Sequence, residues 1–232
     1  MIEELLPAAA AAVEAFDDPP DVPLFEEERA AVKNAVAKRS HEFATGRDCA
    51  RRALERIGRP ALAIPVGERG APQWPPGVVG SIAHCAGYRA SAVAEDTELA
   101  AIGIDAEPHE ALPNGVLKVV ALPEEVSHLR ELARRTGDVH WDRLLFSVKE
   151  SVYKAWFPLT RRWLDFSEAI VSIDPAAQMF HARLLVAGPV VAERELDGFC
   201  GRWLVRNGLV LTATTVPALR VQIPISDIRS PA

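Results

Sequence analysis

The apolar residues between Trp141 and Trp156 recur at helical spacing, and this stripe constrains the fold strongly. Placed at about 100° per residue, they gather on one side of a helix. They are Trp141, Leu144, Leu145, Val148, Val152, Ala155 and Trp156. Ser147, Glu150 and Lys154 fall on the other side, and Pro158 is expected to end the helix because proline cannot continue its hydrogen-bond ladder. The segment therefore predicts a helix with a core face and a separate polar edge.

A second segment, Ile102 to Glu107, alternates apolar residues and then ends in two acids. On a strand, Asp105 and Glu107 point to one face, opposite Ile102 and Ile104. In the helix, Glu150 and Lys154 are four residues apart and lie side by side on one face.

Together, these three carboxylates and one lysine can hold a hard divalent cation beside a phosphate group, because Mg²⁺ takes a few carboxylate oxygens plus substrate phosphates. Each pair also has an ordinary interpretation. Glu150 and Lys154 can be a solvated helix pair that contributes about 0.2–0.5 kcal/mol, and Asp105 and Glu107 can be ordinary residues at a strand end. On these residues alone, both interpretations stay open.

The whole-chain composition predicts a globular protein and excludes some partners. The 232 residues are 49% hydrophobic and 25% charged, and the net charge is −6, so the chain as a whole does not indicate nucleic-acid binding. The charge is uneven, however, since nine Lys or Arg and three acids lie between Arg29 and Arg59. Such a basic stretch indicates a local anion site or a solvated helix face.

Cysteine usage and hydropathy indicate a cytoplasmic protein that does not enter a membrane. Cys49, Cys85 and Cys200 are odd in number and widely spaced, which predicts neither a disulfide framework nor a zinc site. The alanine-rich start carries Glu3 and Glu4 where a secretion signal has basic residues. No apolar run approaches the roughly 20 residues of a membrane span.

The order of predicted elements is similar in the two halves. The first half predicts a short helix or loose strand before the breaker cluster at 17–21, then two consecutive helices over 26–57 that meet near Ser40 and stop at Gly58. A loop rich in Gly and Pro follows at 65–77. Strands are predicted at 78–83, 88–94 and 99–106.

The second half predicts a helix over 140–157 and strands at 169–173, 180–185, 202–205 and 209–215, with a hairpin turn at Asn207-Gly208. Helix followed by antiparallel strands in both halves predicts an α+β protein of two related lobes. We place them at 1–108, which includes the acidic strand, and 109–232. The site is expected in the cleft between them.

Basic residues suited to phosphate extend the predicted site. His84 lies at a tight turn after a strand, next to Cys85, and is either a phosphate ligand or an exposed turn histidine; a Cys–His nucleophile pair is a weaker alternative because no orienting acid is near in sequence. Arg39, Arg47 and Arg51 lie along roughly one helix face, and arginine donates two hydrogen bonds to a phosphate. Arg69 in the Gly/Pro loop is a further candidate. Motifs of the Walker A, dinucleotide-binding, nucleophile-elbow and zinc-protease kinds are absent from the sequence.

From Lys38 to Thr215 the chain resembles the 4′-phosphopantetheinyl transferases of the longer, surfactin/enterobactin-synthetase type, and most of all their actinobacterial branch. Four motifs in this order carry the resemblance: Glu42-Phe43-Ala44-Thr45-Gly46-Arg47-Asp48-Cys49-Ala50-Arg51, Gly77-Val78-Val79-Gly80-Ser81-Ile82-Ala83-His84-Cys85, Gly103-Ile104-Asp105-Ala106-Glu107-Pro108, and Phe146-Ser147-Val148-Lys149-Glu150 continuing to Tyr153-Lys154-Ala155-Trp156-Phe157-Pro158. It implies a monomer of two similar α+β lobes related by a pseudo-twofold axis, each with a long helix on a small antiparallel sheet.

The resemblance also implies an activity, in which phosphopantetheine moves from coenzyme A to a serine of an apo acyl or peptidyl carrier protein and 3′,5′-ADP is released. The pathways served are fatty-acid, polyketide, nonribosomal peptide or siderophore synthesis. The implied metal is Mg²⁺, with Mn²⁺ as the alternative, at a site formed by Asp105, Ala106, Glu107 and Glu150. The implied catalytic residues are Asp105, Glu150 and Lys154.

The implied coenzyme A contacts are Arg39, Arg47, Val66, Gly67, Glu68, Arg69, Ala83, His84, Asp105, Lys149, Glu150 and Lys154. Two of them depart from the family pattern, since Val66 stands where close relatives have a basic residue and Ala83 where others have serine. Both departures are expected to bear on coenzyme A binding and not on the metal. Two other functions remain open on the sequence, a Mg²⁺-dependent phosphohydrolase of nucleotides or coenzyme A and a non-catalytic module that binds coenzyme A or a carrier protein.

Overall fold

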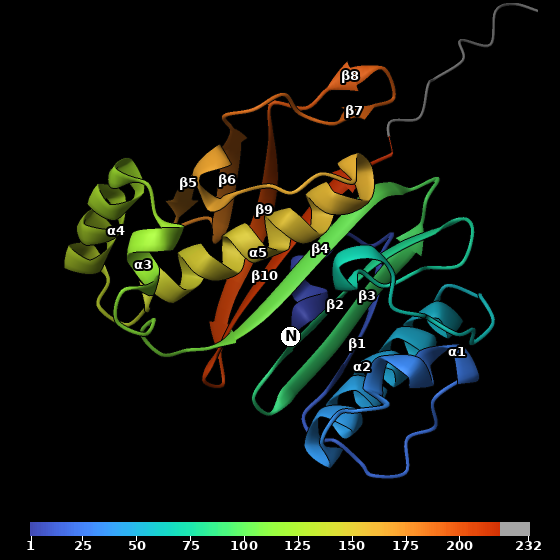
Figure 1. The fold of residues 1–232 in the computed structure, drawn as a ribbon. Coiled ribbons are helices and arrows are strands. Elements are labelled where there is room, and N and C mark those ends of the chain that lie inside the picture. Colours follow the sequence, from blue (N-terminus) through green and yellow to red (C-terminus); the bar gives the residue numbers. More distant parts are fainter. Residues whose placement is uncertain (219–232) are drawn as a thin grey trace, which may run out of the picture.

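Two antiparallel sheets lie next to each other in the computed structural model, which describes residues 1–218 (Figure 1). The smaller sheet has the order β1-β3-β2, formed by β1 (Ala11–Ala15), β2 (Val78–Cys85) and β3 (Tyr88–Glu95). The larger has the order β4-β10-β9-β6-β5, formed by β4 (Leu99–Pro108), β5 (Ala169–Asp174), β6 (Met179–Leu184), β9 (Gly198–Arg206) and β10 (Leu209–Pro217). A separate two-stranded ribbon joins β7 (Val190–Val191) and β8 (Arg194–Glu195).

One long helix packs on each sheet, which confirms the predicted α+β architecture. Helix α2 (Ala37–Arg56) packs against β1 and β3, and helix α5 (Trp141–Thr160) packs against β4 and β10 (Figure 1). The apolar stripe of α5 is buried as its spacing predicts. Short helices complete the described part: α1 (Glu26–Arg29), α3 (Val116–Val120), α4 (Pro123–Arg135) and 3₁₀ turns at Ile2–Leu5, Ala30–Val32, Glu68–Gly70 and Phe166–Glu168.

Helix α5 lies directly on the acidic strand because the strand has a glycine at the crossing. A side chain at Gly103 would begin 1.9 Å from the carbonyl oxygen of Ser151, so only glycine admits the helix at this distance. Buried hydroxyls fix the other side of the contact, where Ser147 and Ser151 meet Thr212 and Thr214 of β10 at 3.0 and 3.2 Å. The polar edge of α5 is thereby placed beside Asp105. Ser147 itself is buried, not on that polar edge as expected.

The acidic strand, β4, is a member of the larger sheet. Strand β4 pairs antiparallel with β10, with Asp105 opposite Thr212. On its other side it lies beside β2, and the amide of Ile104 donates to the hydroxyl of Ser81 at 3.0 Å. A buried apolar cluster continues from β3 through β4 into β10. The acidic strand therefore lies where the two sheets meet, and the division at residue 108 stays a prediction.

Local boundaries differ from the prediction in three places. The break between the helices of the basic stretch falls at residues 33–36, before Ser40, because α2 begins at Ala37. Helix α5 continues past Pro158 to Thr160 and ends where Arg161 adopts a left-handed conformation. The N-terminal segment forms both alternatives, a 3₁₀ turn and then strand β1. The Asn207-Gly208 hairpin is confirmed, with both residues at positive φ between β9 and β10.

No helix within residues 1–218 is long and apolar enough to cross a membrane.

Candidate active site

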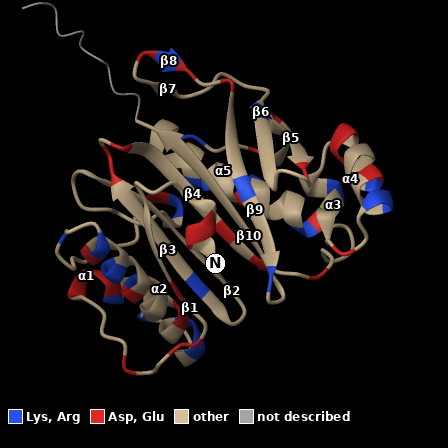
Figure 2. Cartoon of the chain, turned by 180° about the vertical axis from the view of Figure 1, so that it is seen from behind, with Lys and Arg blue, Asp and Glu red and all other residues tan. Residues whose placement is uncertain are grey.

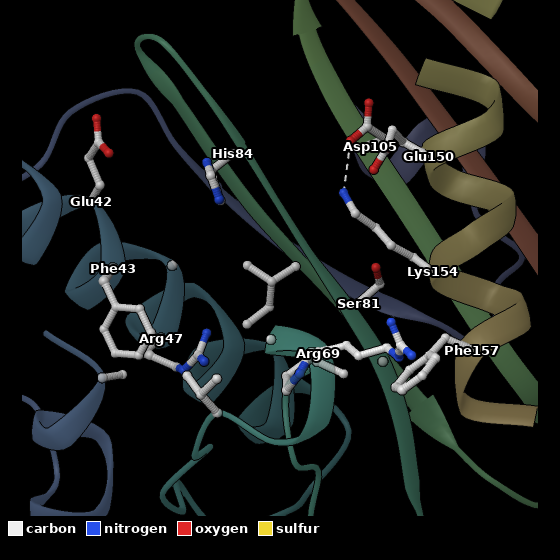
Figure 3. Close-up of a pocket in the computed structure, with 18 of the residues that line it drawn as sticks. Glu42, Phe43, Arg47, Arg69, Ser81, His84, Asp105, Glu150, Lys154 and Phe157 are labelled. Carbon is white, nitrogen blue, oxygen red and sulfur yellow. Dashed lines mark hydrogen bonds and ion pairs between the residues drawn. The ribbon is translucent and has the colours of Figure 1, made fainter. Parts of the chain in front are cut away.

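A cleft of about 860 Å³ opens between the two sheets. Its walls come from α2, β2, the Gly/Pro loop, β4 and α5, so both predicted groups of residues reach it (Figure 3). The acids and Lys154 line one end, and arginines and a histidine line the other. The predicted residues in the walls are Arg39, Arg47, Val66, Arg69, His84, Asp105, Glu107, Glu150 and Lys154.

At the acidic end, Lys154 joins helix α5 to strand β4. Its ammonium lies 2.7 Å from Asp105 Oδ1 and donates to the carbonyl of Ile104 at 3.1 Å (Figure 3). Asp105 is 5% exposed, and its second oxygen, Oδ2, is buried with no hydrogen-bond partner among the described residues. A buried carboxylate oxygen without a donor is costly, so this atom is suited to a cation or a ligand donor.

A second ion pair at this end joins Glu107 to Arg143, a residue that the sequence analysis missed. The guanidinium of Arg143 lies 2.7 Å from Glu107 Oε2 and donates to the carbonyls of Glu110 and Ala111. The helical spacing could have identified Arg143, because it precedes Glu150 by two helical turns and shares its face. Arg143 therefore holds the end of β4 against α5.

Glu150 has no cationic partner within ion-pair distance in the part of the chain that the structure describes. Burial raises the pKa of Glu150, and the charge of Asp105 raises it further, while Lys154 opposes the shift. Burial and Asp105 also raise the pKa of Glu107. Two carboxyls with raised pKa values beside a third carboxylate form a site at which negative charge is crowded.

At the other end of the cleft, the basic side chains differ in their exposure to solvent. Arg47 is 5% exposed, its Nε donates to the carbonyl of Ile64 at 2.7 Å, and its guanidinium lies 4.2 Å from the centroid of the Phe43 ring. Burial lowers the pKa of Arg47 to about 10, so it stays charged at neutral pH. The side chain of Arg39 is 47% exposed. Burial and the charge of Arg39 lower the pKa of His84.

The sequence matches two family models along this arrangement. Residues 27–94 match the 4′-phosphopantetheinyl transferase N-terminal domain, and residues 101–200 match the 4′-phosphopantetheinyl transferase superfamily. Among curated proteins, 4′-phosphopantetheinyl transferase Svp of Streptomyces mobaraensis is 58% identical over 94% of this chain and 90% of its own. The enzyme Npt of Nocardia iowensis is 47% identical over 92% and 98%, and PptT of Mycobacterium tuberculosis is 42% identical over 92% and 96%.

The chain belongs to the 4′-phosphopantetheinyl transferase superfamily. It is a transferase of the actinobacterial type, and it moves phosphopantetheine from coenzyme A to a carrier protein. The resemblance drawn from the four motifs is thereby confirmed.

The donor set of the transferase fits a hard cation that keeps part of its water. Within residues 1–218 no group of three or more His, Cys, Asp and Glu side chains is arranged so that it could hold a metal ion. Mg²⁺ does not require one, since it is usually held by one or two carboxylates, water and substrate phosphates. The unpartnered Asp105 Oδ2 and the raised pKa values of Glu107 and Glu150 suit such an ion. Ala106 is fully buried and is not part of the cleft wall.

Lys149 is outside the main cleft of the transferase. It is 5% exposed, and its ammonium donates to Glu125 at 2.8 Å and to the carbonyls of Val120, Phe166 and Ala169. Its charge is therefore used to join α4 and α5, and burial lowers its pKa. Lys149 does line a smaller cavity of about 80 Å³ that also contacts Glu150 and Tyr153.

Three other expected coenzyme A residues also lie beside the cleft and not in its wall. Gly67 and Glu68 line a neighbouring cavity of about 480 Å³, and Ala83 is fully buried between Ile82 and His84 of β2. Arg51, expected on the same helix face as Arg47, is buried in an ion pair with Glu28 at 3.0 Å. The Cys–His alternative is disfavoured because burial and the charge of Glu107 raise the pKa of Cys85 to about 12, which keeps the thiol protonated.

Sequence reasoning missed several residues that line the cleft of the transferase. They are Glu27, Ala30, Ala31, Val32, Glu42, Phe43, Ser81, Phe146, Tyr153 and Phe157. Glu42 and Phe43 were within a recognised motif, and Tyr153 lies next to Lys154. Residues 27–32 carried no signal, because their approach to the cleft depends on how α1 packs against α2.

Proposed function

We propose that the transferase is Mg²⁺-dependent and that Asp105, Glu107 and Glu150 hold the ion, with Mn²⁺ as the alternative. The observation that carries this proposal is the buried, unpartnered Oδ2 of Asp105 beside two carboxyls with raised pKa values. When bound, the ion neutralises charge on the oxygens of the transferred phosphoryl group. Lys154, fixed by Asp105, adds a second positive charge at the same end of the cleft.

The other end of the cleft binds the phosphates of coenzyme A. Arg39, Arg47, Arg69 and His84 all line the cleft, from α2, the Gly/Pro loop and β2. Figure 3 shows Arg47 and His84 on one side of the cavity and Arg69 beside Phe157. Arg47 suits a single buried phosphate because its partner is a carbonyl and not a carboxylate. We assign it the 3′-phosphate. Val66 lines the cleft without a charge, so the remaining cations carry the phosphate binding.

The smaller cavity beside Glu150 is suited to the uncharged pantetheine arm. Its walls include Leu164, Phe166, Val171 and Ala182, and it shares Glu150 and Tyr153 with the main cleft. An arm that enters it from the diphosphate passes Glu150, which places the reacting phosphorus near that carboxylate. The alkyl chain of Lys149 forms part of this wall, while its ammonium is bound to Glu125. Lys149 would therefore contact the arm through its alkyl chain and not through its charge.

The reaction needs a base for the serine hydroxyl of the carrier protein. Glu150 is the proposed base, acting directly or through water, because it has no ion-pair partner within residues 1–218 and its pKa is raised towards the working pH. The serine oxygen forms a bond to the β-phosphorus as the bond from that phosphorus to the bridging oxygen breaks. The proton passes to Glu150, and 3′,5′-ADP leaves with the bridging oxygen.

The proposed partners are apo carrier proteins of fatty-acid, polyketide, nonribosomal peptide or siderophore synthesis. Enterobactin synthase component D of Salmonella typhi, 30% identical over 78% of this chain and 74% of its own, supports the siderophore class. We further propose that the enzyme acts in the cytoplasm as a monomer, without nucleic acid or membrane.

The deciding experiment is mass spectrometry of apo carrier proteins incubated with the enzyme, coenzyme A and Mg²⁺. We expect one phosphopantetheine added per carrier and 3′,5′-ADP released only when apo carrier is present. Release without carrier would instead indicate a phosphohydrolase. Binding of coenzyme A with no release under any condition would indicate a module without catalysis.

A further inference from the structure

A carboxylate stands among the cations at the phosphate end of the cleft. Glu42 lines the cleft together with Arg39 and His84, and its side chain is 17% exposed. Figure 3 shows Glu42 and His84 at the same end of the cavity. An acid at this place is unexpected because it repels a polyanionic substrate. The proposed mechanism gives it no role.

Each oxygen of Glu42 contacts a different arginine. Oε1 lies 3.0 Å from Arg89, and Oε2 lies 3.5 Å from Arg39. Arg89 is 2% exposed and is itself fixed, because it contacts Asp18 at 2.8 Å and donates to the carbonyls of Tyr88 and Cys85. Glu42 is thus held by a buried arginine on one side and faces a half-exposed arginine on the other.

We infer that Glu42 is a positioning residue that holds Arg39 at the phosphate end of the cleft. The inference rests on the proposed role of Arg39 in phosphate binding. The contact of 3.5 Å is long for an ion pair of this kind, so it orients the guanidinium and leaves its donors for a phosphate. Arg89 in turn keeps Glu42 from folding onto the ligand.

Glu42 also lowers the mutual repulsion of the cations around it. The pKa of His84 is lowered by burial and by the charges of Arg39, Lys154 and Arg89, and Glu42 is the group that acts in the opposite direction. These groups come from α2, α5 and β3. Without Glu42, Arg89 keeps Asp18 and Lys154 keeps Asp105, whereas Arg39 loses its ion-pair contact. The half-exposed Arg39 is therefore the cation that moves away into water.

The test is Glu42→Gln in the full chain, with coenzyme A binding measured by calorimetry and with steady-state kinetics. The amide keeps the size of the side chain but turns either an uncharged oxygen or an N–H towards Arg39. We expect the Kd and the KM for coenzyme A to rise about two- to fivefold, with kcat unchanged. An unchanged or tighter Kd overturns the inference, because it shows that Glu42 is inert or competes with phosphate.

A double-mutant cycle tests whether Glu42 acts through Arg39. If it does, Arg39→Gln/Glu42→Gln binds coenzyme A no more weakly than Arg39→Gln alone. Additive losses overturn the inference. The matched control is Asp48→Asn on the same helix, since Asp48 contacts Arg52 at the same 3.5 Å but outside the cleft. We expect this control to bind coenzyme A as the unmodified enzyme does.

Two further readouts distinguish a specific effect of Glu42→Gln on the cleft from a general loss of fold stability. The imidazole of His84, followed by NMR, is expected to titrate at lower pH in Glu42→Gln than in the unmodified enzyme, and an unchanged titration counts against the inference. If Arg39→Gln alone leaves coenzyme A binding intact, the proposed phosphate role of Arg39 fails, and this inference fails with it. If Arg39→Gln weakens binding and Glu42→Gln does not, this inference alone fails.

Discussion

Lys154 and Asp105 form the contact that brings the two segments of the site together. The lysine is on helix α5 and the aspartate on strand β4, 49 residues apart in sequence, and their charged atoms lie 2.7 Å apart. The pair uses one oxygen of Asp105 and leaves the other buried without a partner within residues 1–218. A single contact therefore fixes the ammonium of Lys154 at the acidic end of the cleft and keeps one carboxylate oxygen available.

The first prediction concerns the carboxylates. Asp105→Asn, Glu107→Gln and Glu150→Gln are each expected to reduce transfer strongly, and the loss of a general base at Glu150 alone is worth about 10²- to 10⁴-fold in kcat. Each change keeps the size of the side chain, so the melting temperature should stay near that of the unmodified enzyme. Full turnover by any one variant would remove that residue from the mechanism, and full activity in excess EDTA would remove the metal.

The second prediction concerns pH and follows from the raised pKa values of Glu107 and Glu150. As the pH is lowered, transfer activity should be lost at a higher pH than it would be if these glutamates had ordinary pKa values. Because the folded-state pKa values are raised, these groups stabilise the fold below about pH 4.3, and this contribution is lost as pH rises through the folded values.

The ionised groups bind the cation, so the upward shift of the melting temperature caused by Mg²⁺ should be larger near neutral pH than near pH 5, where raised pKa values leave more of these carboxyls protonated. Calorimetric melting with and without Mg²⁺ at the two pH values measures this. The matched control is Glu150→Gln, in which the pH dependence of the Mg²⁺ effect should shrink. A Mg²⁺ effect that is equal at both pH values would contradict the assignment of the ligands.

The third prediction concerns the 3′-phosphate. Arg47→Ala should raise the KM for coenzyme A far more than that for dephospho-coenzyme A, because a charge-assisted hydrogen bond is worth roughly 1.5–3 kcal/mol. Arg47 also donates to the carbonyl of Ile64, so the variant should lose some stability as well. Arg51→Ala serves as the control, since Arg51 is buried with Glu28 and should lower stability without changing this discrimination. Equal losses for both substrates would show that Arg47 is structural.

The sequence predicted the parts of this site that local patterns determine. Periodicity predicted the buried stripe of α5, and alternation placed Asp105 and Glu107 on one face of β4. Contacts between segments far apart in the sequence leave no such pattern. This is why the pairing of β4 with β10, and the burial of Lys149 against Glu125, 24 residues away on another helix, could not be predicted. Arg143 and Glu42 did carry a local signal, two helical turns before Glu150 and within a recognised motif, and were nevertheless missed.

The last prediction concerns carrier-protein docking on the segment Ala111–Gly137. Leu129 and Leu132 of this segment do not form an exposed apolar patch, because they are 7% and 2% exposed and pack into the core of the larger sheet. Arg130, Arg134 and Arg135 are exposed on α4. Figure 2 shows the ribbon of this helix coloured for both basic and acidic residues.

If acidic carrier proteins dock here, as the family resemblance implies, the contribution is electrostatic and acts mainly on the association rate. Arg134→Glu/Arg135→Glu should then raise the KM for apo carrier protein, more so at low salt, and leave the Kd for coenzyme A unchanged. Arg183→Glu/Arg194→Glu is the matched control, since it makes the same change of charge at exposed positions of β6 and β8. If both double variants change the KM for apo carrier protein equally, the effect reflects net charge alone. If the KM responds neither to reversal of Arg134 and Arg135 nor to the salt concentration, α4 is ruled out as the docking surface.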